Sequence, residues 1–426
     1  MAHDCAATPL LPKAGSKPRR RNMYSFFCAT LASTTTVLMG YNLAVMSGAQ
    51  LFISEDLGLS ESQTEVLAGS INAYMLVSIL AAGWAADALG RRGTLLVANA
   101  FFTAGALAMS LGGSYAALMA ARFVTSVGSG FSVVVTSVYN AEISPASTRG
   151  LLSSMPEMFI SVGLLLGYVS NYTFAGMPVN QRWRVMFGAA ALPPALLACA
   201  ALAVPESPRW LAMRGRHDDA RVVLARTSDD PAEAELRLQE IKQAVENSNS
   251  NNNNNNNNSS SSSSSVWTDL LVRPSASVRR ILTCVAGVHF FQQASGIDAL
   301  VLYSPLVFKR AGLSSTSTAL VATVAIGVVK MCFVPAAALF ADRLGRRAAP
   351  PRSMAGVALS TLSLGTTLLC AAGSASSSPL TAAAGVASVL GFVAAFSVGL
   401  GPLANAYSAE VIPCACVRRA PASASR

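Results

Sequence analysis

Two adjacent amides and a carboxyl group stand inside a long apolar stretch of this 426-residue chain. They belong to Gln292, Gln293 and Asp298, and the phenol of Tyr303 follows a short way along. Polar side chains at membrane depth cost free energy unless they face a partner or a wet cavity, so they indicate a functional site. Amide and carboxyl groups can together donate to and accept from hydroxyls. We therefore predict a site for a hydroxyl-rich small molecule; hydrogen bonding between neighbouring helices is the alternative interpretation.

Two cationic side chains, Arg122 and Lys330, also fall inside apolar segments. A charged side chain in such a segment normally faces the interior of a helix bundle and a partner. Alternatively, it lies near the membrane surface and extends its head group to water. Gly128 and Gly130 follow Arg122, and we expect them to allow close packing between helices.

Membrane-spanning helices are the elements that must hold these residues. The chain is 52% hydrophobic and only 12% charged, whereas a soluble protein carries about 25% charged residues. Several segments of about 20 residues, the length of a spanning helix, are almost free of charge. We predict an all-α membrane protein in a lipid bilayer. The net charge of +10 is concentrated in short segments between apolar runs, which is typical of topology signals and not of nucleic-acid binding.

Ten spans are expected, near residues 24–53, 64–86, 94–113, 116–141, 151–175, 183–204, 281–308, 317–341, 353–373 and 379–409. The predicted organisation is a basic tail (1–22), a six-helix bundle (23–204), a central loop (205–280), an incomplete four-helix bundle (281–413) and a tail (414–426). The distribution of Lys and Arg predicts a cytoplasmic N-terminus in a multi-pass protein.

The central loop contains one predicted helix and one predicted linker. Asp230 followed by Pro231 is typical of a helix start, with the acid at the N-cap and proline at the first helical position. Residues 247–265 are all Asn or Ser and have no apolar side chains to bury. We predict that this tract is disordered.

Two internal repeats indicate a duplicated architecture. The segment Asp87–Arg92 recurs as Asp342–Arg347, and Tyr139–Pro145 recurs as Tyr407–Pro413. Two parallel halves around a midplane site are typical of major facilitator transporters. The repeat predicts twelve spans, of which the chain supplies ten.

The repeated loops carry charges that could act as a conformational switch. Glycine allows a tight turn in each loop, while Asp and Arg can pair with charged groups at neighbouring helix ends; Glu142 and Arg149 are expected partners. Such networks bias a two-state equilibrium, and setting membrane topology alone is the alternative role. The predicted gating residues are Asp87, Arg91, Arg92, Glu142, Arg149, Asp342, Arg346, Arg347 and Glu410.

Several motifs in order resemble those of sugar porters of the major facilitator superfamily, and most of all plant polyol/monosaccharide transporters. The segments that carry the resemblance are Tyr41–Ala49, Gly167–Asn171, Pro205–Trp210, Gln292–Asp298 and Gly401–Pro402. The resemblance extends over residues 24–413. It implies proton-coupled uptake of polyols and monosaccharides across a plasma membrane, with the glutamine pair and Asp298 in contact with substrate.

The chain departs from the family pattern at several positions, among them Leu164 in the fifth span, where many hexose carriers have a substrate-binding Gln, and two further departures bear on coupling and stacking. Asn42 replaces an Asp that, by the resemblance, takes up the proton opposite Arg122. Because an amide does not titrate, we expect facilitated diffusion in place of tight proton symport. Asn405 replaces a Trp that stacks on the sugar, and its amide could still bind a hydroxyl.

Transport by alternating access is therefore the expected function. A truncated, non-transporting paralogue, either a sugar sensor or the product of a disrupted gene, is the alternative that the missing spans favour. A membrane enzyme is not expected, because the sequence has no His-rich metal motif, nucleophile elbow or phosphate loop. The eight cysteines lack metal-ligand spacing, and we expect no metal or cofactor.

Overall fold

The computed structural model describes residues 23–145, 147–256, 276–313, 315–344, 349–373 and 379–401, and the regular elements in these ranges are all helices. The long helices are α1 (Met23–Leu57), α2 (Glu61–Leu111), α3 (Tyr115–Ile143), α4 (Arg149–Phe174), α13 (Thr316–Leu344), α14 (Ala349–Gly373) and α15 (Pro379–Val398). Eight helices within the described residues are long and apolar enough to cross a membrane. The prediction of an all-α membrane protein is confirmed.

Helix α2 covers the second and third predicted spans without a conventional loop between them. The two segments meet at Gly90, whose φ of 84° and ψ of 168° are not helical. This backbone conformation favours glycine because it places a Cβ under strain. A Cβ at this position would also collide with the carboxylate of Glu206. The tight turn predicted at the Asp–x–x–Gly–Arg–Arg motif is therefore present, between helices that continue almost directly into each other.

Two predicted spans are each built from two shorter helices. The sixth consists of α5 (Val179–Ala189) and α6 (Leu192–Ala201), and α6 begins with Pro193 and Pro194, which have no N–H to continue the α5 hydrogen-bond ladder. The seventh consists of α11 (Ala276–Ala294) and α12 (Ile297–Arg310).

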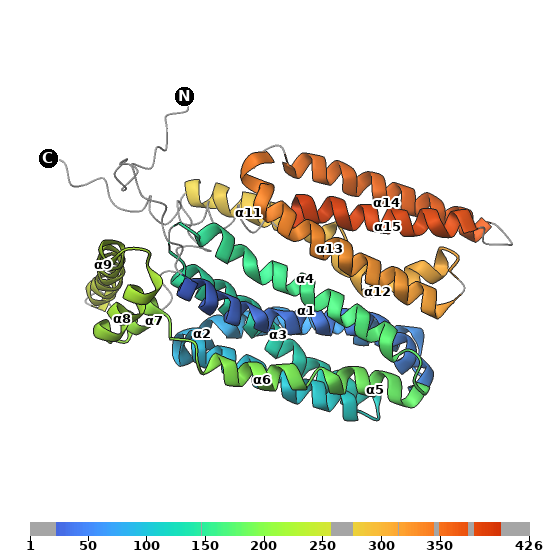
Figure 1. The fold of residues 1–426 in the computed structure, drawn as a ribbon, viewed down its shortest axis with the longest axis horizontal. Helices are drawn as coiled ribbons and strands as arrows, with labels where there is room; N and C mark the ends of the chain where they lie inside the picture. The colour runs from blue at the N-terminus through green and yellow to red at the C-terminus, as the bar shows by residue number, and fades with distance from the viewer. Residues whose placement is uncertain are drawn as a thin grey trace.

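The helices form two groups along one long axis (Figure 1). Helices α1 to α6 make the first group, in which α2 packs on α3 and α1 packs on α4; α11 to α15 make the second. Across the boundary, α4 packs against α13 and α1 packs against α12. The close packing predicted for Gly128 and Gly130 is confirmed, because a Cβ on Gly128 would lie 3.0 Å from the Ala98 carbonyl oxygen and one on Gly130 would lie 2.6 Å from the Ser78 Cβ.

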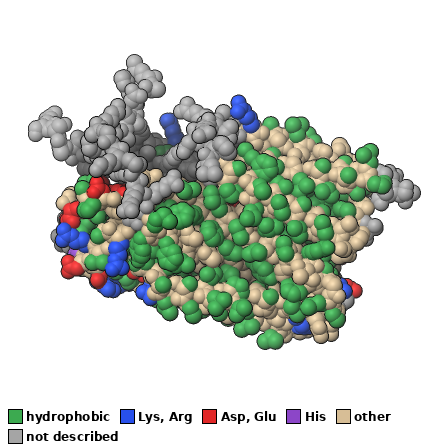
Figure 2. Space-filling model, viewed as in Figure 1, with side chains coloured by type: hydrophobic (Ala, Val, Ile, Leu, Met, Phe, Trp, Pro, Cys, Tyr) green, Lys and Arg blue, Asp and Glu red, His purple; other side chains and the backbone are tan. Residues whose placement is uncertain are grey.

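Helices α7 (Pro208–Met213), α8 (His217–Thr227) and α9 (Pro231–Asn256) form a small cluster at one end of the molecule (Figure 1). We call this end the loop end and the opposite end the far end. The cluster has its own core, which includes Leu211, Leu224 and Leu238. In Figure 2, hydrophobic side chains cover much of the visible helical body, whereas charged side chains gather around the loop end.

Helix α9 begins at Pro231 as predicted but continues to Asn256. It thus extends into the tract 247–265, for which we expected disorder; that expectation is wrong for residues 247–256. Extending an existing helix requires fixing one residue per hydrogen bond and is far easier than starting a new one, so weak helix formers can follow a stable segment. Residues 257–265 lie outside the described part of the chain.

Candidate functional site

A break in the seventh span separates the predicted substrate residues. Helix α11 ends at Ala294, and Gly296 adopts the left-handed conformation (φ 81°, ψ 16°) immediately before α12. The hydroxyl of Ser295 donates to the carbonyl oxygen of Gln292 at 2.6 Å, which satisfies one carbonyl that the break frees. The break places the glutamine pair in the last turn of α11 and Asp298 in the first turn of α12.

The two glutamines differ in their surroundings. The side chain of Gln292 is buried, its Nε2 donates to the Gly401 carbonyl at 3.0 Å, and its Oε1 lies 3.0 Å from Nδ1 of His289. In this conformation Gln292 ties the end of α11 to the segment that follows α15. The side chain of Gln293 is exposed. The amide of Gln292 is thus hydrogen-bonded within the protein and that of Gln293 is accessible, and contact of both with substrate stays a prediction.

Asp298 has a cationic neighbour on another helix. Its carboxyl group is half-buried, and the charge of Lys330 on α13 acts on it. Lys330 is itself only 9% exposed. This burial favours a position of Lys330 inside the helix bundle over one at the membrane surface.

Hydrogen bonds join the two helix groups at three consecutive residues of α12, Val301, Leu302 and Tyr303. Tyr168 Oη donates to the Val301 carbonyl at 3.1 Å, and Gln50 Nε2 donates to the Leu302 carbonyl at 3.1 Å. Tyr303 Oη donates to the Glu65 carbonyl at 3.4 Å. We call this contact region the seam. It places Tyr303, which we predicted to contact substrate, between the helix groups.

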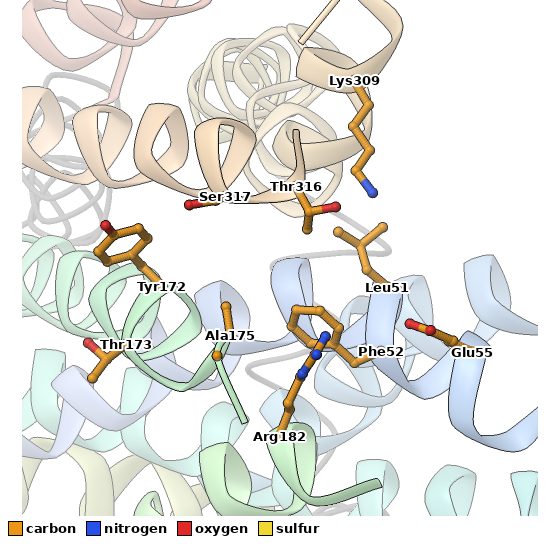
Figure 3. A pocket seen from close by; sticks show the side chains of 11 residues that line it. Leu51, Phe52, Glu55, Tyr172, Thr173, Ala175, Arg182, Lys309, Thr316 and Ser317 are labelled. Carbon is orange, nitrogen blue, oxygen red and sulfur yellow. The ribbon is translucent and has the colours of Figure 1, made fainter. Parts of the chain in front are cut away.

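A cavity of about 590 Å³ lies beyond the seam at the far end. Both helix groups line it: Phe52 and Glu55 from α1, Arg182 from α5, Lys309 from α12 and Thr316 from α13 (Figure 3). The guanidinium of Arg182 lies 5.1 Å from the centre of the Phe52 ring. Along α12 the order is Asp298, the seam and then Lys309, so the seam separates Asp298 from this cavity.

The predicted proton-coupling positions are both buried in the first helix group. Asn42 is 3% exposed, its Nδ2 donates to the Leu38 carbonyl at 2.9 Å, and its Oδ1 has no hydrogen-bond partner in the described structure. Arg122 is fully buried, and none of its three guanidinium nitrogens has a partner among these residues. The two side chains are therefore not hydrogen-bonded to each other.

A dense ionic network closes the loop end of the first group. Arg91 binds Glu142 through two hydrogen bonds of 3.0 Å, and its Nη1 donates to Asp87 at 3.1 Å. The backbone N–H groups of Arg91 and Arg92 donate to the carboxylate of Glu206 at 2.8 and 3.2 Å. The sequence motifs Asp87–Arg92 and Tyr139–Pro145 are thus brought together, and their gating role stays a prediction.

Two details of this network differ from the sequence interpretation. The expected pairing of Glu142 with Arg149 is wrong, because Glu142 pairs with Arg91 and Arg149 is exposed without an ion pair to Glu142 in the described structure. Glu206 was not among the candidates, although an acid next to Pro205 at the end of the sixth span is a signal for a helix-end contact. The guanidinium of Arg92 donates to the Leu202 carbonyl at 2.6 Å.

The second copy of the motif lies only partly within the described residues. Asp342 lies in the last turn of α13. Four other predicted residues, Arg346, Arg347, Asn405 and Glu410, fall outside the described residues.

Known proteins resemble this chain over most of its length. The profile of the family described as "Sugar (and other) transporter" matches residues 28–425. The chain belongs to this family. It is 46% identical to Polyol transporter 5 of Arabidopsis thaliana, over 93% of this chain and 74% of that protein.

Solved structures support the same assignment for this transporter. A partially occluded, inward-open structure of the xylose transporter XylE from E. coli has a TM-score of 0.72 and 25% identity, and the match covers 92% of this chain and 91% of that one. The proton:xylose symporter XylE bound to 6-bromo-6-deoxy-D-glucose has a TM-score of 0.73 and 26% identity, covering 93% and 86%. The chain is thus a multi-pass membrane transporter of the major facilitator superfamily, and the predicted fold and family are confirmed.

Proposed function

We propose that this transporter carries polyols and monosaccharides across the membrane by alternating access. The seam carries the proposal, because it separates the level of Asp298 from a cavity that both helix groups line at the far end. Substrate bound at Gln293 and Asp298 would then be accessible from one side of the membrane at a time. Polyhydroxy substrates suit these groups, since amides and carboxylates together can serve hydroxyls as both donors and acceptors. The polyol and sugar transporters among its relatives support this substrate class.

The loop end faces the cytoplasm in this proposal, and the membrane is the plasma membrane. Arg91, Arg92 and Arg149 lie there together with the charged helices α7 to α9, and an excess of Lys and Arg is typical of cytoplasmic segments. The seam then closes the outer side. A fluorescent tag at the N-terminus should label the cell border and stay inaccessible to antibody until the cells are permeabilised.

We further propose that transport is not tightly coupled to protons. Asn42 stands at the position where the sequence resemblance expects a proton-binding carboxyl, and it is buried in the first helix group. An amide does not gain or lose a proton in the physiological pH range. The proton uptake and release that a symport cycle requires therefore has no titratable group at this position.

Uptake by single variants tests the substrate site. Radiolabelled mannitol, sorbitol and glucose are supplied to cells without carriers of their own that express the protein at their surface. We expect saturable uptake, and a loss of about tenfold or more with Gln293→Ala or Asp298→Asn, because one or two hydrogen bonds to substrate are removed.

The matched controls are Gln181→Ala on α5 and Asp219→Asn on α8, both at exposed positions away from the proposed site. They should leave uptake unchanged. No uptake of any of these compounds despite surface expression would contradict the transport proposal. Uptake that survives both site variants would contradict the assignment of the site alone.

A further inference from the structure

Arg122 on α3 is a buried cation without a counter-charge. Its side chain is fully buried, and Nε, Nη1 and Nη2 all lack hydrogen-bond partners among the described residues. Its guanidinium therefore forms no ion pair in that part of the chain. A buried and unpaired charge is among the most unfavourable groups that a folded protein can contain. Its position therefore needs a physical explanation.

The neighbouring hydroxyls do not provide the missing partner. Thr125 Oγ1 and Ser126 Oγ donate to the backbone carbonyl of Arg122 itself, at 2.9 and 2.7 Å. These bonds occupy the hydroxyl hydrogens within the helix and leave the guanidinium N–H groups unused. The five donors of an arginine thus point into the first helix group without an acceptor.

Asn42 lies in the same layer of the first helix group. A Cβ on Gly105 of α2 would meet Thr125, one helical turn from Arg122, and the adjacent Ala106 packs with Tyr41, the residue before Asn42. Ala121, next to Arg122, belongs to the same buried core as Val45 of α1. The side chains that these contacts place in the layer, Tyr41, Val45, Ala106, Ala121 and Thr125, carry no negative charge that could neutralise the guanidinium.

We propose that Arg122 binds a small monovalent anion, with chloride as the physiological ion. The anion accepts hydrogen bonds from the guanidinium and neutralises its charge. The uncharged amide of Asn42 cannot provide this neutralisation. A carboxylate in place of Asn42 would supply the charge from within the chain and make the anion unnecessary. Anion binding would therefore depend on Arg122 and be lost in Asn42→Asp.

The test measures thermal unfolding of the purified full-length protein in about 0.15 M sodium chloride, sodium bromide or sodium gluconate, at equal ionic strength. A ligand that binds only the folded state raises the Tm. For the unmodified protein we expect Tm in chloride and bromide to exceed Tm in gluconate by about 2–4 °C. The difference should vanish in Asn42→Asp and in Arg122→Gln, and it should remain in Lys330→Gln, which removes a buried cation from the other helix group.

Binding of ³⁶Cl to the purified protein gives a second readout that does not depend on how the variants unfold. We expect saturable binding to the unmodified protein and none to Asn42→Asp, which keeps the arginine. Absence of saturable binding to the unmodified protein would overturn the proposal and leave water as the partner of the guanidinium. Binding that persists in both Asn42→Asp and Arg122→Gln would overturn it as well, because the anion would then lie elsewhere. Neither readout requires transport, so this proposal and the transport function fail separately.

Discussion

Arg91 is the residue with the densest set of contacts at the loop end. Its guanidinium binds Glu142 and Asp87, and its backbone N–H donates to Glu206. The side chains of Arg91 and Glu142 are only 7% and 9% exposed. A buried, bidentate pair of this kind is weakly stabilising as a whole but strongly destabilising when one partner is removed. Its disruption should therefore be costly.

We predict that Glu142→Gln lowers the free energy of unfolding by about 3–5 kcal/mol, because it leaves the Arg91 guanidinium partly unpaired in a buried position. The matched control is Arg221→Gln, which removes a pair of the same 3.0 Å length between groups that are 66% and 47% exposed. That change should cost about 0.2–1 kcal/mol. Unfolding of the purified variants in denaturant measures both. Equal losses would show that the network at the loop end contributes no more than a surface pair.

The hydrogen-bond and ion-pair partners of individual residues were the feature that the sequence predicted least well. Polarity identified Gln292 as a ligand candidate, yet its amide is used by His289 and Gly401 because the break before α12 brings these groups together. Spacing along the chain suggested Arg149 as the partner of Glu142, whereas packing of α2 against α3 places Arg91 there. Such pairings depend on tertiary contacts between segments far apart in sequence.

At the scale of elements, the break between α11 and α12 positions the proposed substrate site. Gly296 has a φ of 81°, and a Cβ there would meet no neighbouring atom within 4 Å. The cost of an Ala at this position thus comes from the backbone alone, about 1–2 kcal/mol. Gly287 in the middle of α11 also has open space around it but lies within the helix, where Ala is favoured by about 0.5–1 kcal/mol.

We predict opposite effects for the two substitutions. Gly296→Ala should lower the unfolding free energy by about 1–2 kcal/mol and reduce mannitol uptake, because a straighter helix moves Asp298 relative to the glutamine pair. Gly287→Ala should raise stability by about 0.5–1 kcal/mol and leave uptake unchanged. Denaturant unfolding and tracer uptake of the same preparations provide the comparison. A stable Gly296→Ala protein with full uptake would show that the break is not needed.

Elements were the part of the fold that the sequence predicted best. Apolar length located the spans, and the glycine of the Asp–x–x–Gly–Arg–Arg motif marked the turn in α2, because glycine adopts a positive φ without strain. The break in the sixth span was missed, although Pro193 and Pro194 were visible signals. The continuation of α9 to Asn256 was missed, because the prediction used only the composition of the tract. It did not consider that the tract follows a stable helix, which is easily extended.

At the scale of the whole molecule, the seam is the proposed gate between the two helix groups. The hydroxyl of Tyr168 is buried and bonds the Val301 carbonyl across the helix groups. Tyr172 lies one turn further along α4, is 47% exposed and lines the far-end cavity. The two tyrosines therefore differ in whether their hydroxyl holds the groups together.

We predict that Tyr168→Phe shifts the conformational equilibrium toward opening at the far end, by about 0.5–1.5 kcal/mol for the lost hydrogen bond. Tyr172→Phe should leave the equilibrium unchanged. Spin labels on Thr173 of α4 and Thr316 of α13, which line the cavity from the two groups, report the separation by double electron–electron resonance. A distance distribution that is identical in all three proteins would argue against the seam as a gate.

Proton movement during transport tests the central claim most directly. The purified protein in liposomes without a membrane potential is exposed to a mannitol gradient, while a pH electrode follows the weakly buffered medium. We predict mannitol uptake without alkalinisation of the medium, and a rate that changes little between about pH 5 and pH 8, because Asn42 does not titrate. Asn42→Asp should introduce both proton uptake and a rate that rises as external pH falls. Stoichiometric alkalinisation by the unmodified protein would contradict the account.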